Sequence, residues 1–268
     1  MDLPSGTSGR AAIDVARHCA EEARRIITEA YGRVVVTEVK GRGNIATETD
    51  LMVERQVTAI LRQEFPTHAL LAEETLAATR SEEWMWVVDP IDGTKNFSRG
   101  IPHFAFAIAL CREGEPVLAL TLHPVTGQEF AAIAGEGFRV NGVPRRVSHI
   151  ETLAGSVAAF DLGYNDERGR SQLQAALHLW PGMQALRVTG SAVLGPAYVA
   201  AGHWDIYVHL DLRPWDIAGG ILLVREAGGV VTDRGGAPVT IYSESVVAAT
   251  PAVHADFMRL VEGIEWRA

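Results

Sequence analysis

Apolar residues recur at helical spacing in two stretches near the start of the chain. Between Ser8 and Ala30 they alternate with Arg and Glu in a pattern that predicts a long amphipathic helix. A second helix is predicted after the cap-type residues 47–50, and it should end before Pro66, because proline cannot continue a helix. Between these helices, Val34-Val35-Val36 predicts a short strand and residues 40–44 a loop.

Strand-like runs follow in the next part of the chain. The apolar and aromatic run 84–88 predicts a buried strand that stops at Asp89, because Pro90 cannot extend a sheet ladder. Ala69-Leu70-Leu71-Ala72 predicts a strand that runs into Glu73. Further runs separated by turn residues predict consecutive antiparallel strands at 105–111, 116–122 and 130–133.

Strand-like and helix-like segments alternate in the second half, from Ser156 to Glu262. Such alternation favours an α/β layer with some parallel strand pairing. A polar segment, 145–152, precedes this half. We therefore expect an N-terminal α+β subdomain of residues 1–148, with an antiparallel sheet, and a C-terminal α/β subdomain of residues 149–268.

Composition and charge narrow the classes of partner. The formal net charge is −9, and no run of Lys and Arg is long enough to form a basic stripe, so we expect no nucleic-acid partner. The two cysteines, Cys19 and Cys111, lie far apart, which favours a reduced compartment and no zinc finger. The first residues lack a secretion signal and the longest apolar stretch is too short to cross a bilayer, so we expect a cytoplasmic protein without membrane contact.

A turn with two acids follows the strand predicted at 84–88. Pro90 has a fixed φ of about −65°, and Gly93 can adopt backbone angles closed to other residues, so the turn can direct Asp89 and Asp92 toward one point. Residues 94–96 predict the start of a short helix whose free N–H groups would face the same point. Carboxylates beside free amides predict a site for metal and phosphate.

Four acids lie near the end of a predicted strand or the start of a predicted helix. Mg²⁺ prefers oxygen ligands and needs only a few carboxylates, because water and substrate phosphate fill its remaining positions. One of the acids precedes Ala218-Gly219-Gly220, small residues that permit close helix packing. A single Asp-Pro or Asp-Gly pair would be an ordinary turn, but four acids so placed predict a metal site. The four are Glu73, Asp89, Asp92 and Asp216.

Short motifs containing these acids occur in order along nearly the whole chain: Thr49-Asp50, Glu73-Glu74, Asp89-Pro90-Ile91-Asp92-Gly93-Thr94, Gly190-Ser191-Ala192, Trp215-Asp216 and Glu226-Ala227-Gly228-Gly229. In their order and approximate spacing they resemble the inositol monophosphatase family of Mg²⁺-dependent, lithium-sensitive phosphatases. The resemblance implies an α+β fold, the layered αβαβα sandwich shared with fructose-1,6-bisphosphatases. It also implies a homodimer.

The resemblance implies a ligand set for two or three Mg²⁺ ions. Glu73, Asp89 and the Ile91 carbonyl would hold one ion, and Asp89, Asp92 and Asp216 would hold a second. Two divalent ions roughly 3.5–4 Å apart can stabilise both the attacking and the leaving oxygen of an in-line displacement. Without cations the carboxylates should repel a phosphate ester.

The resemblance also implies catalytic and substrate contacts. Thr94, oriented by Asp50, would act with Glu73 to position and deprotonate the attacking water, and the amides of Gly93 and Thr94 would hold the phosphate. Ser191 is equally explained as a helix cap, and Lys40 is either a surface lysine or the family's basic residue near the metals. The remaining substrate contacts would come from Gly190, Ser191, Ala192, His209 and Asp216.

One position departs from the family's pattern. Members that act on inositol phosphates commonly carry a Glu seven residues before the Asp of Trp-Asp, where it binds ring hydroxyls, whereas this chain has His209 there and Asp211 two residues later. Phosphate ester hydrolysis is still the expected reaction, but this departure means that inositol need not be the preferred leaving group. We expect a small phosphorylated polyol or sugar, inositol monophosphate first, with fructose 1,6-bisphosphate, histidinol phosphate, NADP and 3′-phosphoadenosine nucleotides as alternatives.

Two other classes of protein remain open on the sequence. A phosphatase of the haloacid dehalogenase type also uses two nearby Asp residues followed by Gly-Thr, but with one residue between the acids and a covalent aspartyl-phosphate. Here two residues separate Asp89 from Asp92. A regulatory binding protein on the phosphatase scaffold is the non-enzymatic alternative, because a fold does not determine function.

Overall fold

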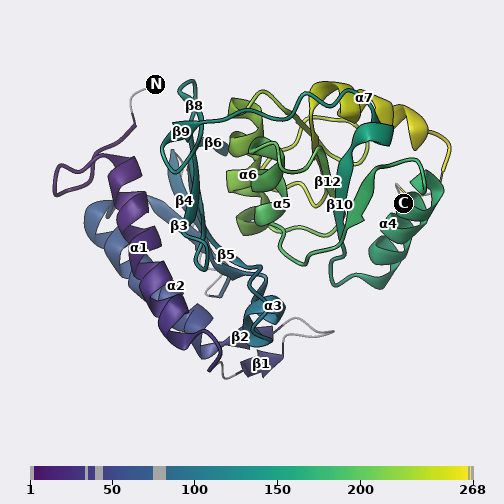
Figure 1. Ribbon diagram of the computed structural model, residues 1–268. Coiled ribbons are helices and arrows are strands. Elements are labelled where there is room, and N and C mark those ends of the chain that lie inside the picture. The colour runs from purple at the N-terminus through teal and green to yellow at the C-terminus, as the bar shows by residue number, and fades with distance from the viewer. Residues whose placement is uncertain (1–2, 34–35, 40–44, 75–82, 265, 267–268) are drawn as a thin grey trace.

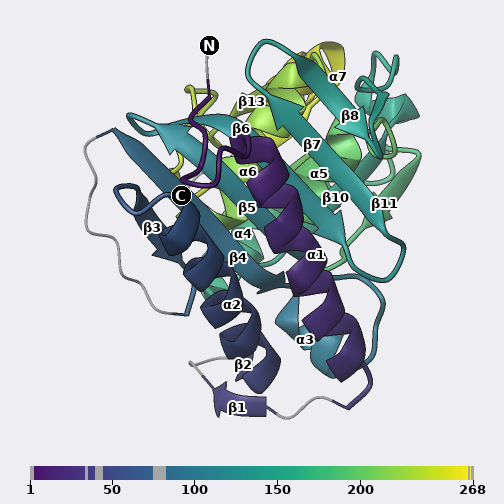
Figure 2. The ribbon, with the colours of Figure 1, turned by 90° about the vertical axis from the view of Figure 1, so that its left-hand side faces the viewer.

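The computed structural model describes residues 3–33, 36–39, 45–74, 83–264 and 266, and these residues form five alternating layers of helix and sheet. Lys40 and part of the strand predicted at 34–36 lie outside the described residues. The first layer consists of helices α1 (Ala12–Ala30) and α2 (Glu48–Glu64), which cover one face of a large sheet (Figures 1 and 2). A small antiparallel hairpin of β1 (Val36–Val39) and β2 (Ile45–Thr47) precedes α2.

The second layer is a seven-stranded sheet in the order β3-β4-β5-β6-β7-β8-β9. β3 pairs with β4 in parallel, and the other neighbours are antiparallel, which confirms the consecutive antiparallel strands predicted from the sequence. The hairpin of β8 and β9 was not predicted, because both strands are short and the glycines beside them indicate only turns. The strands are β3 (Ala69–Ala72), β4 (Trp84–Asp92), β5 (Ala105–Arg112), β6 (Glu115–His123), β7 (Gln128–Ile133), β8 (Gly137–Val140) and β9 (Val143–Pro144).

Helices α5 (Leu194–Ala200) and α6 (Pro214–Glu226) form the middle layer between the two sheets (Figure 1). The second sheet has the order β11-β10-β12-β14-β13, in which β11, β10 and β12 are parallel, as the alternation of elements indicated. Its strands are β10 (Val157–Asp161), β11 (Ala185–Arg187), β12 (Ile206–His209), β13 (Val230–Thr232) and β14 (Val246–Ala249). Helices α4 (Asp166–Leu179) and α7 (Pro251–Leu260) form the fifth layer.

Three apolar clusters hold these layers together, one at each side of the first sheet and one beneath the second. The central cluster joins residues of both halves of the chain around α5 and α6. A Cβ at Gly220 of α6 would lie 2.8 Å from the Cβ of Pro196 in α5, so glycine permits this close approach, as the small-residue pattern predicted. Helix α6 also packs on β4, β5 and β6 of the first sheet, which brings its first turn beside the end of β4.

Strand β4 is longer than the sequence indicated. The prediction that the strand stops at Asp89 was wrong, because β4 continues to Asp92. Its register against β5 shifts between these two acids, which is a bulge around Pro90. Since proline has no N–H for the ladder, a bulge is the place where a strand can contain it. Both acids therefore lie on one bulged strand end rather than in a turn after the strand.

Helix α1 begins later than predicted, and α2 begins earlier, at Glu48 within the cap-type residues 47–50. Residues between Ser5 and Ala11 form a bridged turn, so α1 starts at Ala12 rather than near Ser8. Thr47 caps α2, and Asp50 accepts a hydrogen bond from the Thr47 N–H at 2.9 Å. The reciprocal cap fixes Asp50 in the first turn of the helix.

Candidate metal and phosphate site

Nearly all of the predicted site residues line one cavity of about 660 Å³. The cavity lies where the end of β4 and the short helix α3 (Thr94–Ser98) meet the loops of the C-terminal half. Asp50 is the one predicted residue that does not line it. The predicted residues on its wall are Glu73, Asp89, Ile91, Asp92, Gly93, Thr94, Gly190, Ser191, Ala192, His209 and Asp216.

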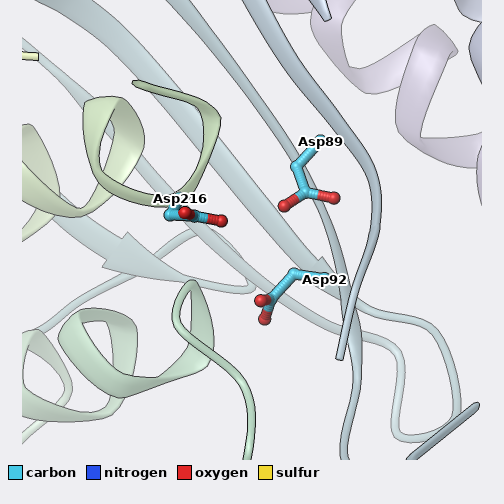
Figure 3. Close-up of side chains that lie close together, drawn as sticks. All are labelled: Asp89, Asp92 and Asp216. Atoms are coloured by element: carbon cyan, nitrogen blue, oxygen red, sulfur yellow. The ribbon is translucent and has the colours of Figure 1, made fainter. Parts of the chain in front are cut away.

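Three of the four predicted acids form a compact group. Asp89 and Asp92 come from the bulged end of β4, and Asp216 from the first turn of α6, and each offers a carboxylate oxygen within 4.8 Å of the others. Figure 3 shows the three carboxylates turned toward a common point. Glu73, which follows β3, lies on the wall of the same cavity but outside this group. Acids far apart in the sequence therefore converge as a metal site requires.

Burial raises the pKa of all three acids, and nearby carboxylates raise it further. The pKa of Asp89 lies well above its usual value, first because the side chain is buried and then because Glu73, Asp92 and Asp216 are close. Burial is also the main cause that raises the pKa of Asp92 to about 6 and that of Asp216 to about 7. Ionising all three together without a cation would be costly.

A buried oxygen of Asp89 provides a direct test of whether these residues fit a metal. Asp89 is 1% exposed, and its Oδ1 accepts no hydrogen bond from any residue that the structure describes. A buried carboxylate oxygen without a donor is destabilising unless a cation supplies the missing interaction. The donor set is all oxygen, which suits Mg²⁺ rather than a softer metal.

Thr94 connects the acids to Asp50 and to the Ile91 carbonyl. Its Oγ1 lies 2.9 Å from the Ile91 oxygen and 3.3 Å from Asp50 Oδ1, and its single proton can be donated to only one of them at a time. Burial raises the pKa of Asp50 to about 6, while hydrogen bonds from Thr47 oppose that rise. Asp50 is thus a buried group within hydrogen-bonding distance of the Thr94 hydroxyl, rather than part of the cavity wall.

Gly93 adopts the backbone conformation that the sequence predicted. Its φ is +81°, in the left-handed region, and a Cβ here would lie 3.1 Å from the carbonyl oxygens of both Gly190 and His103. Only glycine accepts both the φ value and the close approach. The loop that contains Gly190 can therefore lie directly against the start of α3.

Asp92 also holds the loop before α5. It accepts hydrogen bonds from the Ala192 N–H at 3.0 Å, the Val193 N–H at 3.1 Å and the Ser191 hydroxyl. Ser191 Oγ in turn accepts from the Leu194 N–H at 3.2 Å, a cap-like hydrogen bond, although the N-cap residue of α5 is Val193. The same carboxylate that faces the other acids therefore fixes the loop across the cavity.

Asp161 was missed by the sequence analysis. It ends β10 and accepts from the N–H groups of Thr189 at 2.6 Å, Gly190 at 2.7 Å and Ser191 at 3.3 Å. The Tyr207 hydroxyl donates to it at 3.3 Å. Its signal was available, because it directly follows an apolar run in the sequence, as Asp89 does.

His209 and Asp211 also line the cavity and form a second arrangement there. His209 is buried, and burial lowers its pKa to about 4. Its Nδ1 accepts the Asp211 N–H at 3.1 Å, so the neutral ring carries its proton on Nε2. Asp211 accepts from the N–H groups of Tyr164 at 2.8 Å and Asn165 at 3.1 Å, and so holds the loop of Tyr164, a second wall residue that the sequence analysis missed.

The chain is similar to known proteins along nearly its whole length. The model of the inositol monophosphatase family matches residues 10–265. The chain is 35% identical over 245 residues to a Nus factor SuhB of Pseudomonas aeruginosa, covering 88% of this chain and 90% of that protein. It is 33% identical over 257 residues to inositol monophosphatase 3 of Solanum lycopersicum, covering 92% of this chain and 95% of that protein. The solved structure of an IMPase from Thermotoga maritima superposes with a TM-score of 0.84 at 31% identity, covering 93% of this chain and 96% of that one.

These matches agree with the five-layer fold and confirm the family expected from the sequence. The relatives carry two kinds of name, inositol monophosphatase and Nus factor, and the chain is similarly identical to both. Within the described part of the chain, no helix combines the length and the apolar character needed to cross a bilayer.

Proposed function

Because the chain belongs to the inositol monophosphatase family, we propose that it is a Mg²⁺-dependent phosphomonoesterase that hydrolyses a small phosphorylated polyol or sugar. Inositol monophosphate is the first substrate to test. The observation that carries the proposal is the group of Asp89, Asp92 and Asp216, with a buried Asp89 oxygen that has no donor among the described residues. Such a group favours a bound divalent cation over an ordinary structural cluster.

In this proposal the acids hold two or three Mg²⁺ ions. Glu73, Asp89 and the Ile91 carbonyl would hold one, and Asp89, Asp92 and Asp216 a second, in the cavity that these residues line. The cations would supply charge stabilisation at the attacking and leaving oxygens. The Ile91 carbonyl accepts from Thr94 here, so the Thr94 proton would turn to Asp50 when that carbonyl serves as a ligand.

The remaining steps fall to side chains and amides of the chain. Glu73 and Thr94 would hold the attacking water and take its proton, with Asp50 orienting the Thr94 hydroxyl. The amides of Gly93 and Thr94 would hold the phosphate, because they lie at the start of α3 on the cavity wall. The residues proposed to contact the leaving group are Gly190, Ser191, Ala192 and His209, which line the same cavity.

A phosphate-release screen with millimolar Mg²⁺ and with a chelator tests the proposal. Inositol 1-phosphate, fructose 1,6-bisphosphate, histidinol phosphate, NADP and a 3′-phosphoadenosine nucleotide form the panel. We expect Mg²⁺-dependent release from at least one ester. Chemical trapping during turnover separates the two mechanisms: direct attack by water leaves no phosphate on the protein, whereas a phosphate trapped on Asp89 would support a covalent mechanism of the haloacid dehalogenase type.

A second candidate function rests on the names of the relatives. Because a protein 35% identical to this chain is a Nus factor, a regulatory binding role on the same scaffold is the non-enzymatic alternative. Folded protein that binds Mg²⁺ but releases phosphate from no ester in the panel would favour this role over the enzyme. The proposed homodimer is tested separately, by sedimentation of the purified chain.

A further inference from the structure

We propose that Glu54 of α2 is a positioning residue for Glu73, the acid proposed to hold a cation and to take the proton of the attacking water. The inference rests on the proposed phosphomonoesterase function and adds a residue to its machinery. Glu54 itself does not line the cavity. It acts through the backbone of Glu74, the residue next to Glu73.

Glu54 occupies a core position of an amphipathic helix. It is 1% exposed, on the face of α2 that carries the buried residues Val53, Val57 and Leu61. Its Oε2 accepts the Glu74 N–H at 2.8 Å, while its Oε1 accepts no hydrogen bond from any residue that the structure describes. A buried carboxylate oxygen without a donor costs free energy that an apolar side chain would not. Stability alone therefore does not account for an acid at this position.

The hydrogen bond from Glu74 lies where the first sheet stops holding the chain. β3 pairs with β4 in parallel up to Ala72, which lies opposite Val88, and a turn follows at 73–74. Glu73 lines the cavity there, and after burial its charge contributes most to the raised pKa of Asp89, so the two carboxyl groups are close. Because the ladder ends before this turn, an acceptor on α2 restrains the backbone from which the Glu73 side chain extends.

Asp50 lies one turn before Glu54, on the same face of α2. It is fully buried, and its Oδ1 lies 3.3 Å from Thr94 Oγ1. The two groups proposed to activate the attacking water, Thr94 and Glu73, thus each lie near an acid of this helix. Helix α2 packs on β4 (Figure 2), so it can fix both groups relative to each other, as a shared water molecule requires.

Glu64 provides a matched control at the other end of α2. It is 8% exposed and accepts hydrogen bonds from the Ser8 hydroxyl at 2.7 Å and the Ser8 N–H at 3.2 Å. Both glutamates thus hold a neighbouring segment to the same helix, but only the segment held by Glu54 reaches the cavity. A purely structural role for Glu54 predicts that the two positions respond alike to substitution.

Four variants test the inference by their kinetics: Glu54→Met, Glu54→Gln, Glu64→Met and Glu64→Gln. In Glu54→Met, kcat for the best ester of the panel should fall about 10- to 100-fold, the range for loss of a partner behind a metal ligand. KM should stay within about threefold at saturating Mg²⁺, because the proposed phosphate contacts lie at the start of α3. Glu54→Gln should restore most of kcat, since its amide oxygen still accepts from Glu74. Both Glu64 variants should keep the kcat of the parent.

Two measurements without turnover separate this inference from the proposed function. In metal-free protein, hydrogen exchange of the Glu74 amide, followed by NMR, should be about tenfold faster in Glu54→Met than in the parent and unchanged in Glu54→Gln. The Ser8 amide should respond in this way only to Glu64→Met. Calorimetric titration should show weaker Mg²⁺ binding in Glu54→Met than in Glu64→Met, because Glu73 is a proposed ligand.

The failure of each proposal would look different. No phosphate release from any ester by the parent would overturn the phosphomonoesterase, while amide exchange and Mg²⁺ affinity would still decide the role of Glu54. Unchanged Glu74 exchange in Glu54→Met would overturn the inference alone, as would kcat and Mg²⁺ affinity that both equal those of Glu64→Met. A loss of kcat in Glu54→Gln as large as in Glu54→Met would also overturn it, because charge rather than positioning would then matter.

A shorter acid keeps the inference testable if Glu54→Met does not fold. Glu54→Asp retains the negative charge, but its carboxylate is one methylene shorter and cannot reach the Glu74 N–H from the same helix position. Its kcat should fall and its Glu74 amide should exchange faster, and parent-like values of both would contradict the role of Glu54.

Discussion

Burial and charge conflict most directly at Asp89. Its carboxylate lies in a strand interior, beside two other acids, with one oxygen that no described residue satisfies. A structural carboxylate in such a place would be expected to have donors, as Asp161 does. The contrast between these two buried acids supports a ligand role for the first and a structural role for the second.

Asp89→Asn should abolish turnover while the fold is kept. The amide removes one negative charge from the group, so Mg²⁺ affinity falls, and kcat/KM should drop by more than about 100-fold, the upper range for loss of an outer-shell partner of a metal ligand. Without metal, the melting temperature should equal or exceed that of the parent, because repulsion within the group is relieved. Asp14→Asn, on the exposed face of α1, is the control. Turnover comparable to the parent would contradict the ligand assignment.

The raised pKa of Asp216 predicts how the free energy of unfolding depends on pH. Burial and Asp92 raise its folded pKa to about 7, above an unfolded value of about 3.9. The group is protonated in both states below that unfolded value. Between about 3.9 and about 7 it ionises only in the unfolded state, so stability falls as the pH rises across this range and levels off above about 7.

In a chelator, the free energy of unfolding of the parent relative to Asp216→Asn should therefore fall by on the order of 2 kcal/mol between pH 4 and pH 8. The amide can still accept the hydrogen bond from the Arg213 N–H, so the helix start is retained. Urea denaturation at the two pH values measures the difference. Added Mg²⁺ should stabilise the parent more at pH 8 than at pH 5, since metal competes with protons for the carboxylates. A difference independent of pH would contradict this account.

At the scale of elements, the site depends on loops that are tied to strand ends. The loop at 189–191 lies between two carboxylates, Asp161 of β10 and Asp92 of β4, and neither sheet alone positions it. Gly93 and Gly190 permit the contact between this loop and α3. The wall of the cavity is therefore assembled from both sheets.

Asp161→Ala should destabilise the protein and impair the site together. The substitution leaves several backbone N–H groups of the loop without an acceptor, and we expect a loss of about 2–4 kcal/mol in the free energy of unfolding. Asp161→Asn should cost less, because an amide oxygen still accepts. Asp14→Ala, whose side chain is 60% exposed, should change stability little. Urea denaturation of the three variants decides, and a cost near that of Asp14→Ala would contradict the role of Asp161.

The sequence predicted elements with strong periodicity and missed features that depend on neighbours. Helices α1 and α2, and the antiparallel strands after β4, follow from their apolar spacing. The bulge around Pro90 does not, because a proline signals only that the ladder is interrupted, while the partner β5 determines that the strand resumes. Strands β8 and β9 are too short to show an alternation of apolar and polar residues, so the sequence does not indicate this hairpin.

The candidate site was predictable in its acids and not in its supports. Asp89 and Asp92 are close in sequence, and Asp216 was predicted to join them because it lies at the start of a predicted helix. Tyr164 carries no local signal, because its position depends on Asp211, which lies in a different loop. Residues that act through partners distant in sequence need the fold before they can be found.

For the whole molecule, the two cysteines report on the integrity of the layers. Cys19 of α1 and Cys111 of β5 are both fully buried, in apolar clusters on opposite faces of the first sheet, so they cannot pair. Burial raises the pKa of each thiol to about 12. Each should therefore react with a thiol reagent at pH 8 on the order of a thousandfold more slowly than free cysteine.

In denaturant, both thiols should react rapidly and two equivalents per chain should be counted. The absorbance of released chromophore against time measures both phases. Rapid labelling of the native protein would show that one of the layers opens.

The division into subdomains 1–148 and 149–268 stays a prediction, because the central apolar cluster joins both halves around α6.

The position of α6 has a consequence for how the protein is made. Ribosomes deliver β4, with Asp89 and Asp92, long before the helix that carries Asp216 and packs against the same sheet. A nascent chain arrested before α6 would present an open sheet face and an incomplete ligand set. Cation capture should therefore be among the last events of biogenesis, and truncated translation products should be candidates for chaperones and proteases.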